Sequence, residues 1–169
     1  MSAPPGTGSE EHLDADRLYM EMALEEARAA AAIGETPIGA VIVCDGAVVA
    51  RAHNRRETDR DPLAHAEMLA IREAARGLDR WRLSDCTVYV TLEPCPMCAG
   101  AMHASRIDRL VYGAADPKAG AVGTLYDLSS DTRLNHRFRV TSGVCATESS
   151  LLLKEFFAGL RARDKGERS

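Results

Sequence analysis

The chain lacks any run of apolar residues approaching the roughly 18 that a membrane-spanning helix needs, so we expect no membrane partner. Residues 1–11 have neither the basic start nor the apolar stretch of a secretory signal. The 5 cysteines are an odd number without the spacing of a small disulfide-bonded scaffold. Together these absences indicate a cytoplasmic protein whose cysteines remain thiols in a reducing compartment.

No internal repeat and no linker divides the sequence, and its 169 residues suffice for one domain with a substantial core. Residues 1–14 include a stretch rich in Pro, Gly and Ser, and we expect a disordered tail there. Residues 164–169 alternate in charge and are expected to fray. The sequence therefore predicts one folded domain over residues 15–163.

The hydrophobic pattern alternates between helical and strand-like periods. Asp45-Gly46 between two short apolar runs predicts a β-hairpin. Later, a strand, a helix and a strand follow one another through short links, which indicates a parallel βαβ unit. Helices are expected near 20–31, 64–76, 95–105 and 153–160, and strands at 38–44, 47–52, 86–92, 109–113 and, as a strand or an irregular crossing, 140–144. The expected fold class is α/β, with a mixed five-stranded sheet flanked by helices.

Three side chains stand at the spacing of metal ligands: His65, and Cys95 with Cys98 three residues later. A structural zinc site is normally closed by four protein ligands, whereas a catalytic site keeps three and leaves the fourth position to water. Glu67 is not needed to complete the ligand set and is therefore free to carry protons. The sequence predicts a catalytic site with one Zn²⁺ per subunit and Glu67 as its acid–base residue.

Two other interpretations of the Cys95/Cys98 pair are a redox dithiol and half of a zinc ribbon. A ribbon needs a second cysteine pair, which the sequence does not contain. A redox dithiol needs no histidine and leaves Glu67 and the flanking Pro94 and Pro96 unexplained. The remaining histidines are not expected to bind the metal; they are His12, His53, His103 and His136.

The order His-x-Glu followed by Pro-Cys-x-x-Cys is the signature of zinc-dependent nucleobase deaminases. From about Met20 to Arg163 the chain resembles this superfamily and, more narrowly, the bacterial TadA-type tRNA adenosine deaminases. The segments that carry the resemblance are 35–41, Asn54-Arg55, 61–67, 89–101, 105–107, 113–118 with Asp116 and Lys118, Asn135-His136 and Phe156-Phe157. The resemblance implies a three-layer cytidine deaminase-like fold, a homodimer, and the anticodon stem-loop of a tRNA as partner.

The resemblance also assigns roles to residues. Glu67 would take a proton from the zinc-activated water and pass it to ring N1 of adenine, so that adenosine becomes inosine and ammonia leaves. The substrate-binding residues implied are Asn54, the backbone of Ala66, Asp116 and Asn135. Two ordinary alternatives remain, because Asn54 could simply end a strand and Asp116 could cap a turn before Pro117. The chain departs from the family at His53, where an aromatic residue such as Trp is common.

The net charge of −4 suits a small-molecule enzyme better than a nucleic-acid binder. Basic residues nevertheless cluster around Asn54 and along the last helix; they are Arg51, Arg55, Arg56, Arg60, Lys154, Arg161, Arg163, Lys165 and Arg168. The leading hypothesis is a deaminase of wobble adenosine in tRNA. The alternatives are a deaminase of free guanine or cytosine bases or nucleosides, and a zinc-stabilised binding module without catalysis. An inert module would have no need of Glu67 or an open coordination position.

Overall fold

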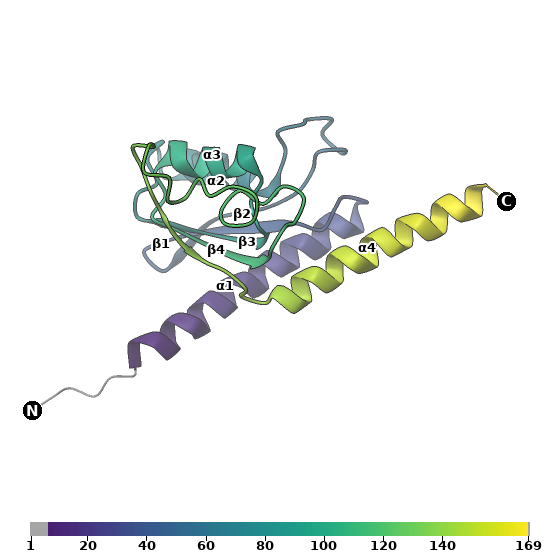
Figure 1. The fold of residues 1–169 in the computed structure, drawn as a ribbon, viewed down its shortest axis with the longest axis horizontal. Helices are drawn as coiled ribbons and strands as arrows, with labels where there is room; N and C mark the ends of the chain where they lie inside the picture. Colours follow the sequence, from purple (N-terminus) through teal and green to yellow (C-terminus); the bar gives the residue numbers. More distant parts are fainter. Residues whose placement is uncertain (1–6, 169) are drawn as a thin grey trace, which may run out of the picture.

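The protein, described by a computed structural model over residues 7–168, is a three-layer α/β sandwich (Figure 1). Its elements in chain order are α1 (Thr7–Ala32), β1 (Gly39–Cys44), β2 (Ala47–His53), α2 (Ala66–Gly77), β3 (Cys86–Leu92), α3 (Pro96–Ser105), β4 (Arg109–Ala114), β5 (Arg139–Thr141) and α4 (Ala146–Glu167). Within the described residues, no helix is both long and apolar enough to span a membrane.

The sheet is mixed, with the strand order β2-β1-β3-β4-β5. β1 pairs antiparallel with both β2 and β3, whereas β4 pairs parallel with β3 and with β5. Asp45 and Gly46 both have positive φ, at 50° and 73°, which is the backbone of the tight turn expected between β1 and β2. The predicted hairpin and the predicted parallel βαβ unit are both confirmed. The last strand, β5, is shorter than the predicted segment 140–144 and ends at Thr141.

Helices cover both faces of the sheet, and the interior strand β1 shows how side chains are divided between the two faces. All 6 residues of β1 are buried. Ile42 and its alternate neighbours pack in a cluster with α2 and α3, while Val41 and Val43 pack against α1. Figure 1 shows α2 and α3 on one face and α1 with α4 on the other. This arrangement brings the starts of α2 and α3 together at one edge of the sheet.

The two predicted tails differ from the structure. α1 begins at Thr7, within the segment expected to be disordered, and residues 1–6 lie outside the described part of the chain. Glu10, Glu11 and Leu13 are good helix formers, and an acidic residue in the first turn suits a helix N-terminus. At the other end α4 continues to Glu167 rather than fraying from 164. α4 is also less buried than its apolar spacing predicts, because Phe157 is exposed.

A buried ion pair joins α1 to β4, and a hydrogen bond joins it to β3. Asp16 accepts two hydrogen bonds from the Arg109 guanidinium, at 2.8 and 2.6 Å, and a third from the Tyr89 hydroxyl at 2.9 Å. Its side chain is only 4% exposed. Because a charge this deep is costly unless it is paired, each partner depends on the other.

Asp16→Asn is expected to lower the free energy of unfolding by about 3 kcal/mol, since it leaves the Arg109 guanidinium without its counter-charge. Urea unfolding followed by circular dichroism measures the change. Asp14→Asn, at an exposed position of the same helix, is the matched control and should stay within about 0.5 kcal/mol of the parent. Equal stabilities for the two variants would show that the Asp16–Arg109 pair is not needed.

Candidate active site

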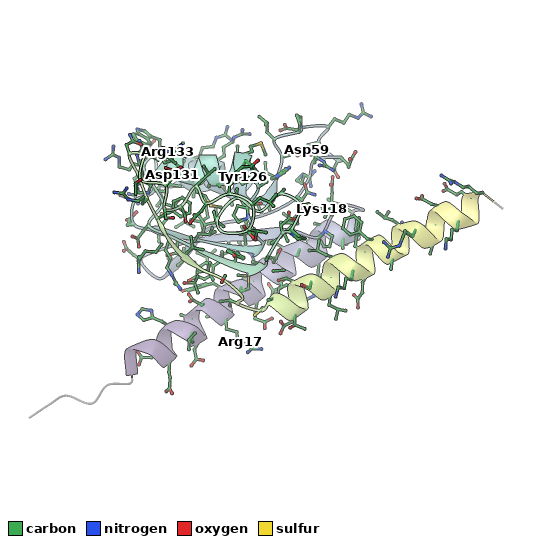
Figure 2. The ribbon with its side chains drawn as sticks, in the orientation of Figure 1. Arg17, Asp59, Lys118, Tyr126, Asp131 and Arg133 are labelled. Atoms are coloured by element: carbon green, nitrogen blue, oxygen red, sulfur yellow. The ribbon has the colours of Figure 1, made fainter. Side chains whose placement is uncertain are left out.

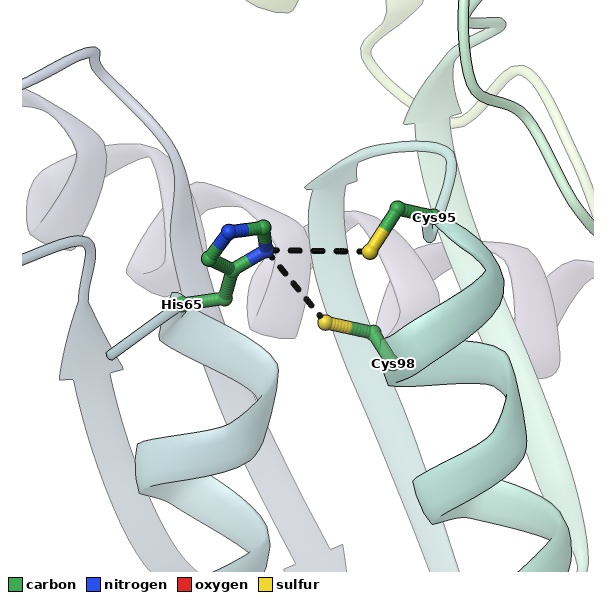
Figure 3. Close-up of side chains that lie close together, drawn as sticks. All are labelled: His65, Cys95 and Cys98. Carbon is green, nitrogen blue, oxygen red and sulfur yellow. Dashed lines mark hydrogen bonds between the residues drawn. The ribbon is translucent and has the colours of Figure 1, made fainter. Parts of the chain in front are cut away.

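The ends of two helices supply the predicted metal ligands. His65 is the N-cap residue of α2, Cys95 is the N-cap residue of α3, and Cys98 lies in the first turn of α3. Pro96 occupies the first turn of α3, where a missing N–H costs nothing and a fixed φ favours the helix. α2 and α3 contact each other on the same face of the sheet, and their first turns lie side by side (Figure 3).

The three ligand atoms converge as a metal site requires (Figure 3). His65 Nδ1 lies 3.7 Å from Cys95 Sγ and 3.6 Å from Cys98 Sγ. In a tetrahedral zinc site, bonds of about 2.3 Å to sulfur and 2.0 Å to nitrogen separate the two ligand atoms by about 3.5 Å. One imidazole nitrogen and two sulfurs are also the donors that zinc prefers. The residues present therefore fit a zinc ion with a fourth position left open.

The protonation states of the Cys95 and Cys98 thiols depend on each other. The Cys98 thiol donates a hydrogen bond to Cys95 and, with His65, lowers the pKa of Cys95 to about 4. The same contact, together with burial, raises the pKa of Cys98. A divalent cation binds both sulfurs as thiolates, and its positive charge favours the loss of their protons. Cys95 is thus ready to bind as a thiolate, and metal binding would displace the proton of Cys98.

Glu67 is buried in the first turn of α2, next to these ligands. Burial raises the pKa of its carboxyl group, and the negative charge of Cys95 acts in the same direction. A raised pKa makes the carboxyl group hold a proton more readily, which suits an acid–base residue that must both accept and donate one. The position of Glu67 is therefore compatible with the predicted role.

A small cleft of about 100 Å³ opens onto this group of residues. Its lining consists of Thr36, Ile38, Asn54, Arg56, His65, Ala66 and Glu67. Asn54 follows β2 directly and is buried; its Nδ2 donates to the Thr36 carbonyl at 3.4 Å, and its Oδ1 accepts from the Arg56 amide at 3.2 Å. The structure thus brings two of the predicted substrate-binding residues, Asn54 and Ala66, to the same cleft as Glu67.

The other two predicted substrate-binding residues lie elsewhere. Asp116 Oδ1 accepts from the Lys118 amide at 2.9 Å, which is the turn-capping contact of the alternative interpretation. Asp116 lines a neighbouring groove that shares Thr36 with the cleft. Asn135 is exposed, and its Oδ1 lies 3.1 Å from His103 Nε2. Neither residue contributes to the lining of the cleft beside Glu67, and their assignment to substrate binding stays a prediction.

The histidines outside the ligand group have other partners or positions. His53 Nδ1 lies 2.8 Å from the Glu26 carboxylate, and His136 Nε2 lies 2.8 Å from the Ile107 carbonyl oxygen. His12 is exposed on α1. Among the described residues, none of these histidines belongs to a group that could hold a metal.

Two buried acids that organise the site were not singled out from the sequence. Glu93, just before Pro94-Cys95, accepts hydrogen bonds from the amides of Asp116, Val122 and Thr124 and from the Thr124 hydroxyl. It therefore ties the 116–124 loop to the start of α3. Glu35 accepts from the Thr58 amide and hydroxyl at 2.6 and 2.8 Å, and so holds the loop after Asn54. In the sequence, each of these glutamates stands one or two positions before a proline, in Glu93-Pro94 and Glu35-Thr36-Pro37.

The chain matches the family profile of the cytidine and deoxycytidylate deaminase zinc-binding region over residues 13–114. It is 52% identical over 153 residues to a tRNA-specific adenosine deaminase of Bacillus subtilis, covering 90% of this chain and 95% of that protein.

Two solved structures resemble the fold. One, from work on A-to-I editing by tRNA:A34 deaminases at the wobble position, has 48% identity and a TM-score of 0.78, covering 80% of this chain and 99% of that chain. The other is a guanine deaminase from Nitrosomonas europaea with 28% identity and a TM-score of 0.71, covering 93% of this chain and 94% of that chain. From these matches and the geometry of the site, the chain belongs to the zinc-dependent deaminases of the cytidine deaminase-like fold, in the family of the tRNA-specific adenosine deaminases.

Proposed function

We propose that this enzyme deaminates the wobble adenosine of a tRNA anticodon loop to inosine, with water as co-substrate and ammonia as second product. The observation that carries the proposal is the buried Glu67 beside three convergent ligand atoms in a chain 52% identical to a tRNA-specific adenosine deaminase. A flipped, unpaired nucleotide of a hairpin loop is the kind of substrate that such a small cleft can admit.

The residues divide the chemistry among them. His65, Cys95 and Cys98 hold the zinc ion, which when bound supplies Lewis-acid activation of a water molecule. Glu67 takes up a proton from the attacking water and delivers it to ring N1, and then moves a second proton to the departing amino group. The backbone of Ala66 and the side chain of Asn54, both lining the cleft, orient the base.

Basic side chains near the cleft support an RNA substrate despite the net negative charge. Arg51 and Arg55 are paired with acids, Arg51 with Glu25 and Arg55 with Asp59, so they contribute less positive charge than the sequence suggests. The groove that adjoins the cleft is lined by other cations and an exposed ring, including Lys118, Lys154 and Phe157, and Arg161 continues it along α4. Figure 2 shows Lys118 on the side of the domain that faces α4.

This groove gives Asp116 a role consistent with the prediction, because the residue lines it beside the cations. A phosphate backbone lying along Lys118 and Lys154 would place the neighbouring loop nucleotide at Thr36, which lines both hollows. Base stacking on Phe157 would add to the binding.

The zinc-loaded protein should form inosine in an anticodon stem-loop with adenosine at the wobble position and release no ammonia from free adenosine, guanine or cytosine. A stem-loop with guanosine at that position is the control for background ammonia. The guanine deaminase alternative rests on the similarity to the Nitrosomonas europaea enzyme. Ammonia from free guanine, with an unchanged stem-loop, would establish that alternative instead.

The protein is proposed to be a homodimer and to be located in the cytoplasm. An apolar groove between α2 and α3, bordered by Met68, Ile71 and the 60% exposed Trp81, supports a protein contact. Light scattering on the purified protein measures the mass in solution, and a mass of one chain at micromolar concentration would exclude the dimer. Subcellular fractionation tests the location.

A further inference from the structure

A second cluster of metal-binding side chains lies at the opposite end of β3 from the active site. Cys86 begins β3 and Cys44 ends β1, whereas the zinc ligand Cys95 follows the other end of β3. β3 spans seven residues from Cys86 to Leu92, and at about 3.3 Å per residue the two ends are about 20 Å apart. None of the residues of this cluster lines the cleft described above.

The register of the sheet places the two cysteines directly opposite each other. Cys44 pairs with Cys86 in the antiparallel ladder. The Cys86 amide donates to Leu83 and its carbonyl accepts from Asp108, so both groups are directed away from β1. The two residues therefore form a pair without mutual backbone hydrogen bonds, in which side chains approach most closely.

Asp85 completes the cluster with a carboxylate. The Cys44 thiol donates to Asp85 Oδ2 at 3.3 Å, and the Cys86 thiol donates to Oδ1 at 3.7 Å. One ligand atom from each of the three residues lies within 4.8 Å of the other two, the same criterion that the active-site triad meets. For zinc, bonds of about 2.3 Å to sulfur and 2.1 Å to oxygen at a tetrahedral angle separate the ligand atoms by about 3.6 Å.

Charge also suits a divalent ion here. Two thiolates and one carboxylate carry three negative charges, and a divalent cation would leave one. Arg80 Nη2 donates to Asp85 Oδ1 at 2.7 Å, so its positive charge balances the remainder and its contact orients the carboxylate. Oδ2 is left to face the sulfur of Cys44.

We propose that Cys44, Cys86 and Asp85 form a second site for a thiophilic d¹⁰ cation such as Zn²⁺ or Cd²⁺, separate from the catalytic centre. Binding releases the two thiol protons, forms two metal–sulfur bonds and one metal–oxygen bond, and leaves a solvent-facing position. Sulfur donors select soft ions, so Mg²⁺ and Ca²⁺ should not bind. The ion would fasten the end of β1 to the start of β3, next to the hairpin turn.

The test is a titration of the full-length, fully reduced protein with Cd²⁺, read as thiolate-to-metal charge-transfer absorbance and as metal per chain after removal of free ion. The parent protein should reach two ions per chain. The double variant Cys44→Ser/Cys86→Ser should stop at one. Cys145→Ser removes a cysteine outside both clusters and should still reach two.

A parent protein that stops at one ion in excess Cd²⁺ would overturn the proposal, and so would a double variant that still binds two. Because both cysteines are buried, Asp85→Asn provides a variant on a more exposed side chain that keeps both thiols. It should weaken binding of the second ion at least about tenfold, as the loss of a ligand or its partner does. An unchanged second affinity in Asp85→Asn would exclude the carboxylate as a ligand.

Discussion

Glu67→Gln is expected to reduce the deamination rate about 10²- to 10⁴-fold while the protein keeps its zinc. Glutamine has nearly the size of glutamate and retains the packing of the buried side chain, but it cannot take up and release a proton. Since the proposed ligands are His65, Cys95 and Cys98, metal binding should not depend on the carboxylate. Single-turnover rates on the anticodon stem-loop, with zinc measured per chain, give both quantities.

The matched control for this variant is Glu73→Gln, a glutamate on the same helix that does not line the cleft. Its rate should equal that of the parent. A Glu67→Gln variant that turns over at the parental rate would remove the acid–base assignment, and one that loses zinc would mean that the carboxylate supports the ligands rather than the proton transfer.

Gly39→Ala is expected to prevent folding, or to lower the free energy of unfolding by more than about 5 kcal/mol, a large part of the stability of a typical domain. A Cβ atom at this position would lie 2.0 Å from the Ala23 carbonyl oxygen and 2.6 Å from the Ala27 amide nitrogen. Both are backbone atoms of α1, so they cannot move aside as a flexible side chain could. Overpacking that side chains can absorb costs only about 1–3 kcal/mol.

Gly159→Ala in α4 is the control for the glycine substitution itself. The nearest atom to a Cβ there is the end of the Arg163 side chain at 3.9 Å. Alanine is the better helix former, and this variant should gain about 0.5–1 kcal/mol. Urea unfolding compares the two variants; a Gly39→Ala protein as stable as the parent would show that α1 does not pack on β1 at this distance.

The consequence of Gly39 for function follows from its neighbours. Ile38, which lines the cleft, accepts a backbone hydrogen bond from Asn54 at 3.1 Å. Gly39 itself donates to the Thr91 hydroxyl at 3.2 Å. Displacement of α1 from β1 would therefore disturb the wall of the cleft that holds Asn54, and a folded Gly39→Ala protein should also lose activity.

The parts of the fold that could be predicted were those encoded by neighbouring residues. The Asp45-Gly46 turn fixes the hairpin because few residues accept its positive φ. The short links around α3 allow only a parallel crossover between β3 and β4. The extent of α1 could not be predicted, because the helix propensity of its first residues carries it beyond the predicted boundary. The exposure of α4 could not be predicted either, because this helix packs less of its apolar face than the spacing of its apolar residues implies.

The candidate site divides in the same way. The sequence predicts the metal donors and Glu67 because ligand chemistry restricts both the residue types and their spacing, and the structure brings the three proposed ligands together. Asn54 and Ala66 were placed by resemblance, and the structure brings them to the cleft. Asp116 and Asn135 had the same support, yet they lie outside it. The roles of Glu93 and Glu35 could not be predicted, because the loop amides that donate hydrogen bonds to them come close only after folding.

The order of the residues is enough to predict a three-donor zinc site, a free carboxylate beside it and a mixed sheet between helices. The folded chain is needed to see which residues share the cleft, why Gly39 must have no side chain, and that Cys44 and Cys86 face each other. The physical reason is that donor type and hydrophobic period are local properties, whereas strand register and helix packing join residues dozens of positions apart.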